Sequence, residues 1–279
     1  MPSCSHVFRG VEWQTSTPKH ILLYRALGWE PPVFAHLPLI MNADGTKLSK
    51  RQNHLHVVSL RERHYFPEAV LNFVTLIGGG FTDKEYSLQT IHGLSELVDM
   101  FEVSRIHSSS GRLEMERLNE LNQNCLKQKL AGSEKGSLVR RCRDIVRQNL
   151  VGVDQRYLED SVIFKYLAWG QDRIRNLNDF VQPEYLYLWR VPDKVAGLCC
   201  DSKVLAEIRT LFNASEAFAS FNKELKTFCK KNGVKYPQAM TDLRILLTGE
   251  AEGPPVKEIV EILGLPEAKQ RVSKVDKNF

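Results

Sequence analysis

The sequence lacks several features that mark whole classes of protein. No apolar run reaches the roughly 18 residues that a membrane-spanning helix requires, because Asn72 and Thr75 interrupt one of the longest. The six cysteines include no C-x-x-C pair, which argues against a zinc site and favours free thiols in a reducing compartment. Residues 1–10 hold one arginine and no apolar core, so no signal peptide or arginine-rich transit peptide is visible in the chain.

A large excess of charge of one sign is absent as well. Lys and Arg total 38 against 33 Asp and Glu, and the net charge of +5 permits a polyanionic partner without requiring one. The 279 residues are 43% hydrophobic and 25% charged, which are ordinary globular values. This length predicts two domains and permits three, and the composition allows a buried core.

The first 45 residues predict a strand, a helix and a second, bent strand. A short β-type run at 6–8 precedes a Thr-Pro pair at 17–18, which suits the start of a helix. The apolar stretch 33–41 contains Pro38, which predicts an edge or bent strand, and a tight Asp-Gly turn follows at 44–45. A doubly wound sheet needs more strands than these, so we expect this region to be part of a larger α/β domain.

The rest of the chain is predicted to be all-α. From Pro67 an almost wholly apolar helix runs to the three glycines at 78–80, and it should be buried on most sides. Further helical windows, separated by Gly, Pro and Asn, are predicted at 87–100, 110–129, 136–150, 162–170, 203–232 and 254–263. Breaks are expected near 126–135 and 191–201.

The segment Lys47-Leu48-Ser49-Lys50-Arg51 carries the clearest chemical signal. It places three cations and a hydroxyl on a loop after the tight turn, and a mobile ammonium there could follow the negative charge that develops on a transferring phosphorus centre. For such a run taken alone, a solvated basic loop is the commoner explanation. The motifs that precede it favour the chemical interpretation.

Five motifs follow one another in a set order. They are R-G-V-E-W at 9–13, S-T-P-K-H at 16–20, L-G-W at 27–29, H-L-P-L at 36–39 and K-L-S-K-R at 47–51. This set resembles the glutamyl-tRNA synthetases, in which the second half of the class I catalytic domain carries such motifs and a KMSKS-type loop. Residues 243–249 and 254–264 look like the closing helices of the family's anticodon-binding region.

The resemblance implies a mostly α fold that begins with the remnant of a Rossmann-like class I catalytic α/β domain. We expect the C-terminal part of that domain at 1–46, the KMSKS loop and stem-contact domain at 47–126, and two helical anticodon-binding subdomains at 127–195 and 196–279. Glutaminyl-tRNA synthetases share this architecture but have β-barrel anticodon domains, and the helical windows after residue 126 argue against them.

The resemblance also implies roles for individual residues. Lys47 and Lys50 are the expected catalytic residues, which stabilise the charge of the pyrophosphate leaving group. Arg9 is expected to bind the glutamate substrate, because a guanidinium can grip a carboxylate with two hydrogen bonds, and Arg173 and Arg175 are expected to contact the tRNA. The expected ATP site comprises Glu12, Trp13, Lys47, Leu48, Ser49, Lys50 and Arg51.

Structural alternatives stay open for these residues. Arg9 could be a surface arginine at a strand end, and Trp13 a buried tryptophan beside a solvated Glu12. The aromatic residues Tyr185, Tyr187 and Trp189 could stack on unpaired bases or pack in the core. A basic helix face could contact phosphates or be merely solvated; its arginines are Arg140, Arg141, Arg143 and Arg147.

The implied parent reaction joins glutamate to tRNA-Glu through a glutamyl-adenylate made from ATP. Mg²⁺ is expected with the ATP, and the sequence identifies no protein ligands for a metal. The expected partners are tRNA-Glu, glutamate and ATP, with no membrane contact and an unknown oligomeric state. A mitochondrial matrix location follows from the resemblance alone.

Two departures from the family pattern bear on activity. The H-x-G-H motif, whose histidines meet the α-phosphate in the family, occurs nowhere in this sequence, and Gln52-Asn53-His54 stands where relatives commonly have Gly-Asp. We therefore expect a fragment or short isoform that is inactive alone. A non-catalytic tRNA-binding or regulatory isoform is the alternative.

Overall fold

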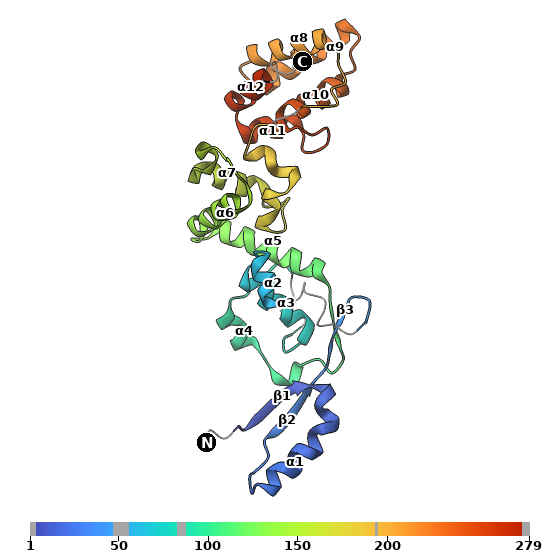
Figure 1. The fold of residues 1–279 in the computed structure, drawn as a ribbon, viewed down its shortest axis with the longest axis vertical. Coiled ribbons are helices and arrows are strands. Elements are labelled where there is room, and N and C mark those ends of the chain that lie inside the picture. Colours follow the sequence, from blue (N-terminus) through green and yellow to red (C-terminus); the bar gives the residue numbers. More distant parts are fainter. Residues whose placement is uncertain (1–3, 47–55, 83–87, 193–194, 275–279) are drawn as a thin grey trace. The chain divides into compact units, whose positions relative to one another are not determined.

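The structure, a computed structural model, describes residues 4–46, 56–82, 88–192 and 195–274. The chain divides into two compact units, Met1–Gln128 and Lys129–Phe279 (Figure 1). Helices dominate both units, and the strands of the described residues form two short parallel pairs in the first unit. The predicted mostly α fold is confirmed, and the finer division into four domains stays a prediction. Among the described residues, no helix combines the length and the apolar character that crossing a membrane demands.

The first unit begins with a β–α–β segment that positions Arg9. β1 (His6–Gly10) pairs in parallel with β2 (Val33–Leu37), and their register places Arg9 beside His36. Between the strands lie the 3-10 helix η1 (Val11–Ser16) and α1 (Thr17–Ala26), whose second residue is a proline. Proline fits there because the first turn of a helix has no use for its missing N–H.

The apolar stretch after β2 forms a second short strand. β3 (Ile40–Asn42) begins two residues after Pro38 and pairs in parallel with β4 (Gly111–Leu113) rather than with β1. Pro38 cannot donate to a sheet, so the chain leaves one strand pair there and joins another. The expected bent strand is therefore two strands.

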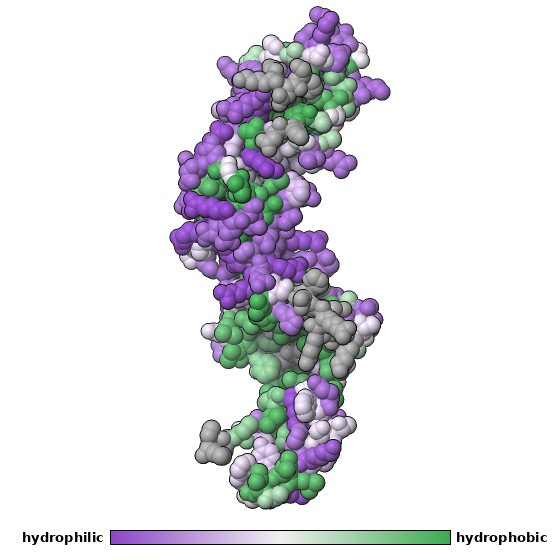
Figure 2. Space-filling view, viewed as in Figure 1, coloured by the Kyte–Doolittle hydropathy of each residue, from purple (hydrophilic) through white to green (hydrophobic). Residues whose placement is uncertain are grey.

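The β–α–β segment exposes an apolar surface. Leu22, Leu23 and Leu27 of α1 and its C-terminal end are each more than half exposed, as are Phe8 on β1 and Val33 on β2. Figure 2 shows hydrophobic residues in green on this N-terminal part of the chain. Two strands and one helix cannot cover both faces of a parallel sheet, so this segment exposes area that larger α/β domains bury.

The remainder of the first unit is helical. Its elements are α2 (Val57–Glu62), α3 (Pro67–Gly78), α4 (Leu94–Met100), η3 (Val103–Arg105) and α5 (Met115–Ala131). Helix α3 buries Phe73 and Ile77, whereas Val74 is 52% exposed, so the prediction that this helix is buried on most sides is wrong. Gly79 follows the helix in left-handed backbone with φ 77°, which confirms the predicted stop at 78–80.

The second unit is built from helices and 3-10 turns. They are α6 (Lys135–Asn149), η4 (Gln155–Leu158), α7 (Asp160–Gly170), η5 (Leu177–Val181), η6 (Pro183–Leu188), α8 (Ser202–Ala214), α9 (Phe218–Asn232), α10 (Tyr236–Thr248), α11 (Val256–Leu263) and α12 (Leu265–Lys274). The single helix predicted at 203–232 is two helices, α8 and α9. Ser215 and Ala217, between the two helices, have extended backbone conformations. The apolar periodicity of the sequence did not predict this break.

An aromatic cluster forms one core of this unit. Trp189 is fully buried, and its Nε1 donates to the carbonyl of Phe180 at 2.7 Å. The rings of Tyr166 and Phe180 meet Trp189 edge-on, at centroid distances of 5.3 and 6.2 Å. Gly170 lies so close to the Phe180 ring that a Cβ there would collide with it. Core packing is thus the correct interpretation of Trp189 and Tyr187, and the backbone is a 3-10 helix rather than an extended segment.

One fully buried arginine, Arg271 on α12, joins separate parts of the second unit. Its Nη1 donates to the carbonyl oxygens of Tyr187 at 2.7 Å and Leu247 at 3.1 Å. Its Nε donates to Glu267 at 2.8 Å, and its Nη2 lies 3.3 Å from the hydroxyl of Tyr157. These partners belong to η6, α10, α12 and η4, so one guanidinium fixes four elements around it.

The carboxylate of Glu267 balances this buried charge. It accepts a hydrogen bond from Tyr157 at 2.5 Å and pairs with Arg156 at 3.1 Å. Burial opposes its ionisation, but the hydrogen bonds from Tyr157 and Arg271 and the charges of Arg271 and Arg156 outweigh burial and lower its pKa. The ionised carboxylate therefore stabilises the fold above the pKa of an unfolded glutamate, about 4.3, and this contribution is lost as the pH falls through the lower folded pKa.

Replacing Arg271 by methionine should lower the free energy of unfolding by about 3–5 kcal/mol, because it leaves Glu267 as a poorly paired buried charge. Urea unfolding of the full chain, followed by circular dichroism, measures the change. Removing both charges, in Arg271→Met with Glu267→Leu, should recover part of the loss. The control is Arg147→Met at an exposed arginine of α6, with an expected change within about 0.5 kcal/mol. A loss below about 1 kcal/mol for Arg271→Met would contradict the bridging role.

Candidate functional site

The guanidinium of Arg9 is held by three side chains, none of which is a carboxylate. Its Nη2 donates to Thr17 Oγ1 at 2.7 Å, and its Nε donates to His36 Nε2 at 3.2 Å. Its Nη1 lies 2.9 Å from Nδ1 of His20. The ring of Phe34 lies against the guanidinium, with its centroid 4.5 Å from the guanidinium carbon. These contacts orient the cation on four sides without neutralising it.

Local structure explains why these groups meet. Parallel register places His36 of β2 beside Arg9 of β1, and the first turn of α1 supplies Thr17 and His20, which are three residues apart. Residues three apart on a helix share a face, so both side chains reach the same guanidinium. The sequence motifs pointed to Arg9 but not to the three side chains that orient it. The signal was the recurrence of polar residues at 17, 20 and 36 in segments that fold against one strand.

A cavity of about 360 Å³ opens beside Arg9. Its lining is Val7, Arg9, His20, Leu23, Tyr24, Leu27, Trp29 and Phe34. The lining contains a cation and no carboxylate, and no Asp or Glu of the described residues forms an ion pair with Arg9. Arginine binds carboxylates with two parallel charge-assisted hydrogen bonds, so the cavity is suited to a small ligand with a carboxylate.

Glu12 and Trp13 lie on η1, next to this cavity in sequence but outside its lining. Trp13 is 50% exposed, so the alternative of a buried tryptophan is wrong. Its ring centroid lies 6.3 Å from that of His20. The carboxylate of Glu12 folds back over Gly10, where any Cβ would collide with it. Both side chains are thus presented at the surface near Arg9.

The predicted phosphate-binding loop, Lys47 to Arg51, lies outside the described residues. The turn that leads into it is well defined, because Asp44 accepts hydrogen bonds from the backbone N of Thr46 at 2.9 Å and from its hydroxyl at 2.7 Å. These hydrogen bonds lower the pKa of Asp44. The turn also joins Asn42 N to the carbonyl of Thr46 at 2.8 Å, so the chain enters the loop from a fixed position.

Arg173, the first predicted tRNA contact, lies in the turn that follows α7. It donates from Nη1 to the carbonyl of Trp169 at 3.0 Å and from Nη2 to Glu258 at 2.5 Å. Its guanidinium also lies 4.5 Å from the centroid of the Trp169 ring. The side chain is therefore oriented, and it uses only part of the five N–H donors that an arginine carries.

A cavity of about 640 Å³ lies beside Arg173. Its lining comprises Arg173, Pro183, Glu184, Tyr185, Tyr187, Thr248, Glu250, Glu252, Gly253, Pro254 and Pro255. Residues of η6 thus meet the end of α10 and the turn after it, although the two segments are about 60 positions apart in sequence. No motif of the sequence pointed to the three glutamates, because exposed acidic residues of a 3-10 helix or a turn form no distinctive local pattern.

The other predicted basic contacts divide into two kinds. Arg175 is exposed and does not line this cavity. Its backbone N–H donates a hydrogen bond to the Asp179 carboxylate at 2.8 Å. On α6, Arg143 is structural rather than a phosphate contact, because it pairs with Asp160 and donates to the carbonyl of Leu158 at 2.9 Å. Arg140 and Arg147 are exposed on the same helix.

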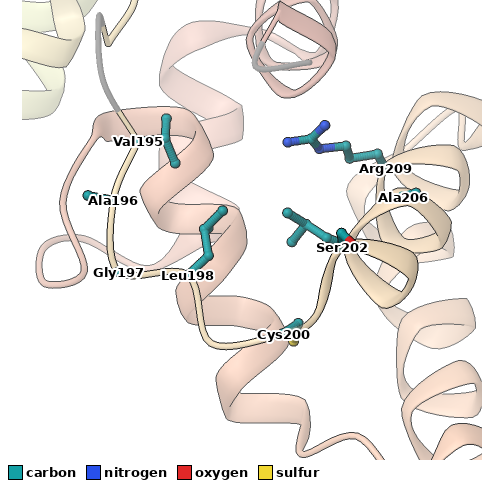
Figure 3. Close-up of a pocket in the computed structure, with 9 residues that line it drawn as sticks. Val195, Ala196, Gly197, Leu198, Cys200, Ser202, Ala206 and Arg209 are labelled. Carbon is teal, nitrogen blue, oxygen red and sulfur yellow. The ribbon is translucent and has the colours of Figure 1, made fainter. Parts of the chain in front are cut away.

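A further cavity of the second unit, of about 400 Å³, lies between residues 195–200 and α8 (Figure 3). Figure 3 shows Arg209 reaching from α8 toward Val195. Burial lowers the pKa of Arg209, and the buried carboxylate of Asp242 fixes the opposite wall by accepting the backbone N–H of Cys199 at 2.7 Å. This cavity contains none of the residues that the sequence singled out for function.

Comparison with known proteins matches both units. The family described as "tRNA synthetases class I (E and Q), catalytic domain" matches residues 1–128, and the family described as "Anticodon binding domain" matches residues 137–275. The mitochondrial glutamate–tRNA ligase of Schizosaccharomyces pombe is 30% identical over 97% of this chain and 52% of its own length. The glutamate–tRNA ligase of Prosthecochloris aestuarii is 31% identical over 97% of this chain and 55% of its own length.

A solved structure shows the same fold. The crystal structure of a glutamate tRNA ligase from Elizabethkingia meningosepticum, in complex with its amino acid, superposes with a TM-score of 0.73 at 24% identity. The superposition covers 97% of this chain and 56% of the chain in that crystal structure. This chain likewise spans about half the length of the curated relatives that it matches. The two domain families match in the expected order, and the relatives align with about 97% of this chain. The chain therefore belongs to the glutamyl-tRNA synthetase family.

Proposed function

We propose that the protein to which this chain belongs is a glutamate–tRNA ligase, which activates glutamate with ATP to glutamyl-adenylate and transfers the glutamyl group to tRNA-Glu. The observation that carries this proposal is the Arg9 guanidinium, which is oriented by Thr17, His20 and His36 and has no carboxylate partner among the residues that the structure describes. Its proposed ligand is the carboxylate of the amino acid. The glutamate–tRNA ligases among the relatives support the choice of glutamate.

ATP is the proposed second substrate, held beside Arg9. Trp13 offers an exposed flat face on which a purine can stack, and Glu12 lies next to it. Lys47 and Lys50 would stabilise negative charge on the departing pyrophosphate rather than move protons, and Leu48, Ser49 and Arg51 would complete the loop around the phosphates. Mg²⁺ would arrive on ATP, because the described residues contain no group of three or more His, Cys, Asp or Glu that could hold a metal.

The second unit is the proposed tRNA-binding part. The cavity beside Arg173 can admit an unpaired base, since its volume and the partly exposed ring of Tyr185 suit a flat ring. Arg175 on the exposed segment and the exposed Arg140 and Arg147 are the proposed phosphate contacts. The mitochondrial matrix is the proposed location, supported by the Schizosaccharomyces relative, although bacterial relatives are equally similar.

A non-catalytic tRNA-binding isoform is the second candidate. The 279 residues contain no H-x-G-H motif, which the resemblance implies as the contact to the α-phosphate, so this chain taken alone would bind tRNA without catalysing the reaction. Both candidates require tRNA binding, and only the first requires chemistry by the protein, so activity assays separate them.

Glutamate should bind the 279-residue chain weakly and saturably through Arg9. Fluorescence of Trp29, which lines the same cavity, can report the titration. Arg9→Met should weaken binding by about 10- to 100-fold, which corresponds to the roughly 1.5–3 kcal/mol of a hydrogen bond to a charged group. Arg25→Met, at an exposed arginine of α1, is the matched control and should titrate like the unaltered chain. Equal titrations for Arg9→Met and the unaltered chain would exclude Arg9 as the glutamate ligand.

The chain alone should show no glutamate-dependent exchange of pyrophosphate into ATP above background. The physical reason is that activation requires groups on the α-phosphate, and no motif of this sequence resembles the family's histidine contacts to it. The measurement is isotope exchange with the purified chain, with tRNA binding measured in parallel to show that the protein is folded. Robust exchange would instead make this chain a ligase by itself.

Arg173→Ala should reduce affinity for tRNA-Glu by about 1–3 kcal/mol and leave an anticodon-altered tRNA almost unaffected, as the loss of a base contact does. Arg175→Ala should weaken both tRNAs equally and reduce the salt slope by about 0.7–0.9, as the loss of one phosphate contact does. Filter binding at several salt concentrations measures both, and thermal unfolding checks that Arg173→Ala, which loses the Glu258 pair, stays folded. Equal losses on both tRNAs for Arg173→Ala would make it a phosphate contact.

A further inference from the structure

One face of α8 and the loop before it enclose the cavity of about 400 Å³ shown in Figure 3. Four residues of the helix line it, namely Ser202, Leu205, Ala206 and Arg209. Their spacing of i, i+3, i+4 and i+7 places them on one side of the helix, opposite residues of the loop 195–200. Seven positions of an α-helix span about 10 Å, so this wall is elongated, with Ser202 and Arg209 at its two ends.

Hydrogen bonds fix both walls of this cavity. The fully buried carboxylate of Asp242, on α10, accepts the backbone N–H groups of Cys199 at 2.7 Å and Cys200 at 2.8 Å. On the other wall, the carboxylate of Asp201 accepts the backbone N–H of Val204 at 2.9 Å and caps the start of α8. The loop and the helix therefore have defined positions, as the walls of a preformed ligand site do.

The described lining carries a single charge in surroundings that are otherwise mostly apolar. Its apolar members are Val195, Ala196, Leu198, Leu205 and Ala206. Burial and the neighbouring Asp242 raise the pKa of the Cys200 thiol to about 12, so this group is neutral at physiological pH. The one ionised side chain among the described lining residues is that of Arg209. A ligand that suits this lining has an apolar body and one anionic end.

The guanidinium of Arg209 is largely removed from water. The residue is 9% exposed, and burial lowers its pKa, because a charge is less stable where less water surrounds it. A bound anion offsets this cost, and a carboxylate matches two parallel N–H groups of a guanidinium. Arginine carries five N–H donors, so Arg209 can bind such a ligand in addition to the contacts that it makes within the chain.

We infer that this cavity is a binding site for an elongated carboxylate with an apolar body, such as a medium-chain fatty acid. The guanidinium of Arg209 binds the carboxylate, and the apolar side chains of α8 and of the loop enclose the hydrocarbon chain. The site shares no lining residue with the cavity beside Arg9 or with the cavity beside Arg173. It therefore goes beyond the activation of glutamate and the binding of tRNA, and it stands or falls without them.

The test measures the binding of octanoate to the full 279-residue chain by isothermal titration calorimetry. Octanoate should bind saturably. Butanoate should bind about 10- to 100-fold more weakly, because it buries four fewer methylene groups. Octanamide has the same hydrocarbon chain without the charge, and it should also bind about 10- to 100-fold more weakly, because the hydrogen bond to a charged group is lost.

Arg209→Met removes the charge of the cavity and keeps a long side chain in its place. It should weaken the binding of octanoate by about 10- to 100-fold and leave that of octanamide almost unaffected. Lys203→Met is the matched control, since it removes an exposed positive charge of the same helix that does not line the cavity. The control should bind octanoate as the unaltered chain does.

Ala206→Phe tests the apolar part of the site without touching the charge. Ala206 is exposed and lines the cavity, so a phenylalanine there fills space that the ligand needs and leaves the buried core as it is. This variant should weaken octanoate and octanamide alike. Thermal unfolding followed by circular dichroism checks that each variant is folded, and if Arg209→Met is not, Ala206→Phe and the comparison of octanoate with octanamide still decide.

Arg9→Met separates this site from the cavity proposed for glutamate, which also combines an arginine with apolar residues. The inference expects octanoate binding to persist in Arg9→Met and to be weakened in Arg209→Met. The reverse result would place octanoate at Arg9 and overturn the inference. Equal binding of octanoate and octanamide, or no saturable binding of octanoate at all, would overturn it as well, and neither result would bear on the binding of glutamate or tRNA.

Discussion

The hydrogen bonds of the buried Arg271 guanidinium are the constraint on which the second unit depends. Arg271 donates to the carbonyl of Tyr187, whose side chain lines the cavity beside Arg173, and to that of Leu247, which precedes Thr248 in the same lining. One side chain therefore fixes both walls of the cavity, which come from distant parts of the sequence. Because both carbonyl oxygens bind the same buried guanidinium, the distance between them can change little. The two segments that line the cavity are therefore held at a fixed separation.

The three arginines that matter most differ in the charge that faces them. Arg271 is fully buried and balanced by Glu267, and Arg173 is half-exposed and balanced by Glu258. Arg9 is oriented by a hydroxyl and two imidazoles and has no carboxylate partner among the described residues. A guanidinium whose charge is already paired acts by position and hydrogen bonding, whereas one without a counter-charge can bind an anionic ligand. This difference supports a structural role for Arg271 and the carboxylate ligand that we propose for Arg9.

Sequence reasoning succeeded where the signal was local and failed where distant segments meet. The three glycines at 78–80 predicted the end of α3, and the motif around Arg9 predicted its place on a strand. The sequence left open whether Arg143 contacts phosphates or solvent, and its ion pair with Asp160 could not be foreseen because Asp160 lies 17 residues away, in the next helix. Glu250 and Glu252 meet Tyr187 only through tertiary packing, so no local pattern could reveal them. The roles of Lys47 and Lys50 stay predictions, since their loop lies outside the described residues.

The two units differ in how completely they bury their apolar surface, and this difference bears on chemistry. The second unit buries Trp189, Phe212 and Phe221, so the surface proposed to bind tRNA lies over a well-packed core. The β–α–β segment leaves Leu22, Leu23 and Phe8 exposed around a guanidinium that water can reach. A charge–carboxylate contact strengthens as water is excluded, because the effective dielectric falls from that of bulk water toward that of a protein interior. A surface that covered this apolar area would therefore also raise the affinity of Arg9 for the carboxylate proposed as its ligand, and would couple assembly of the site to its proposed chemistry.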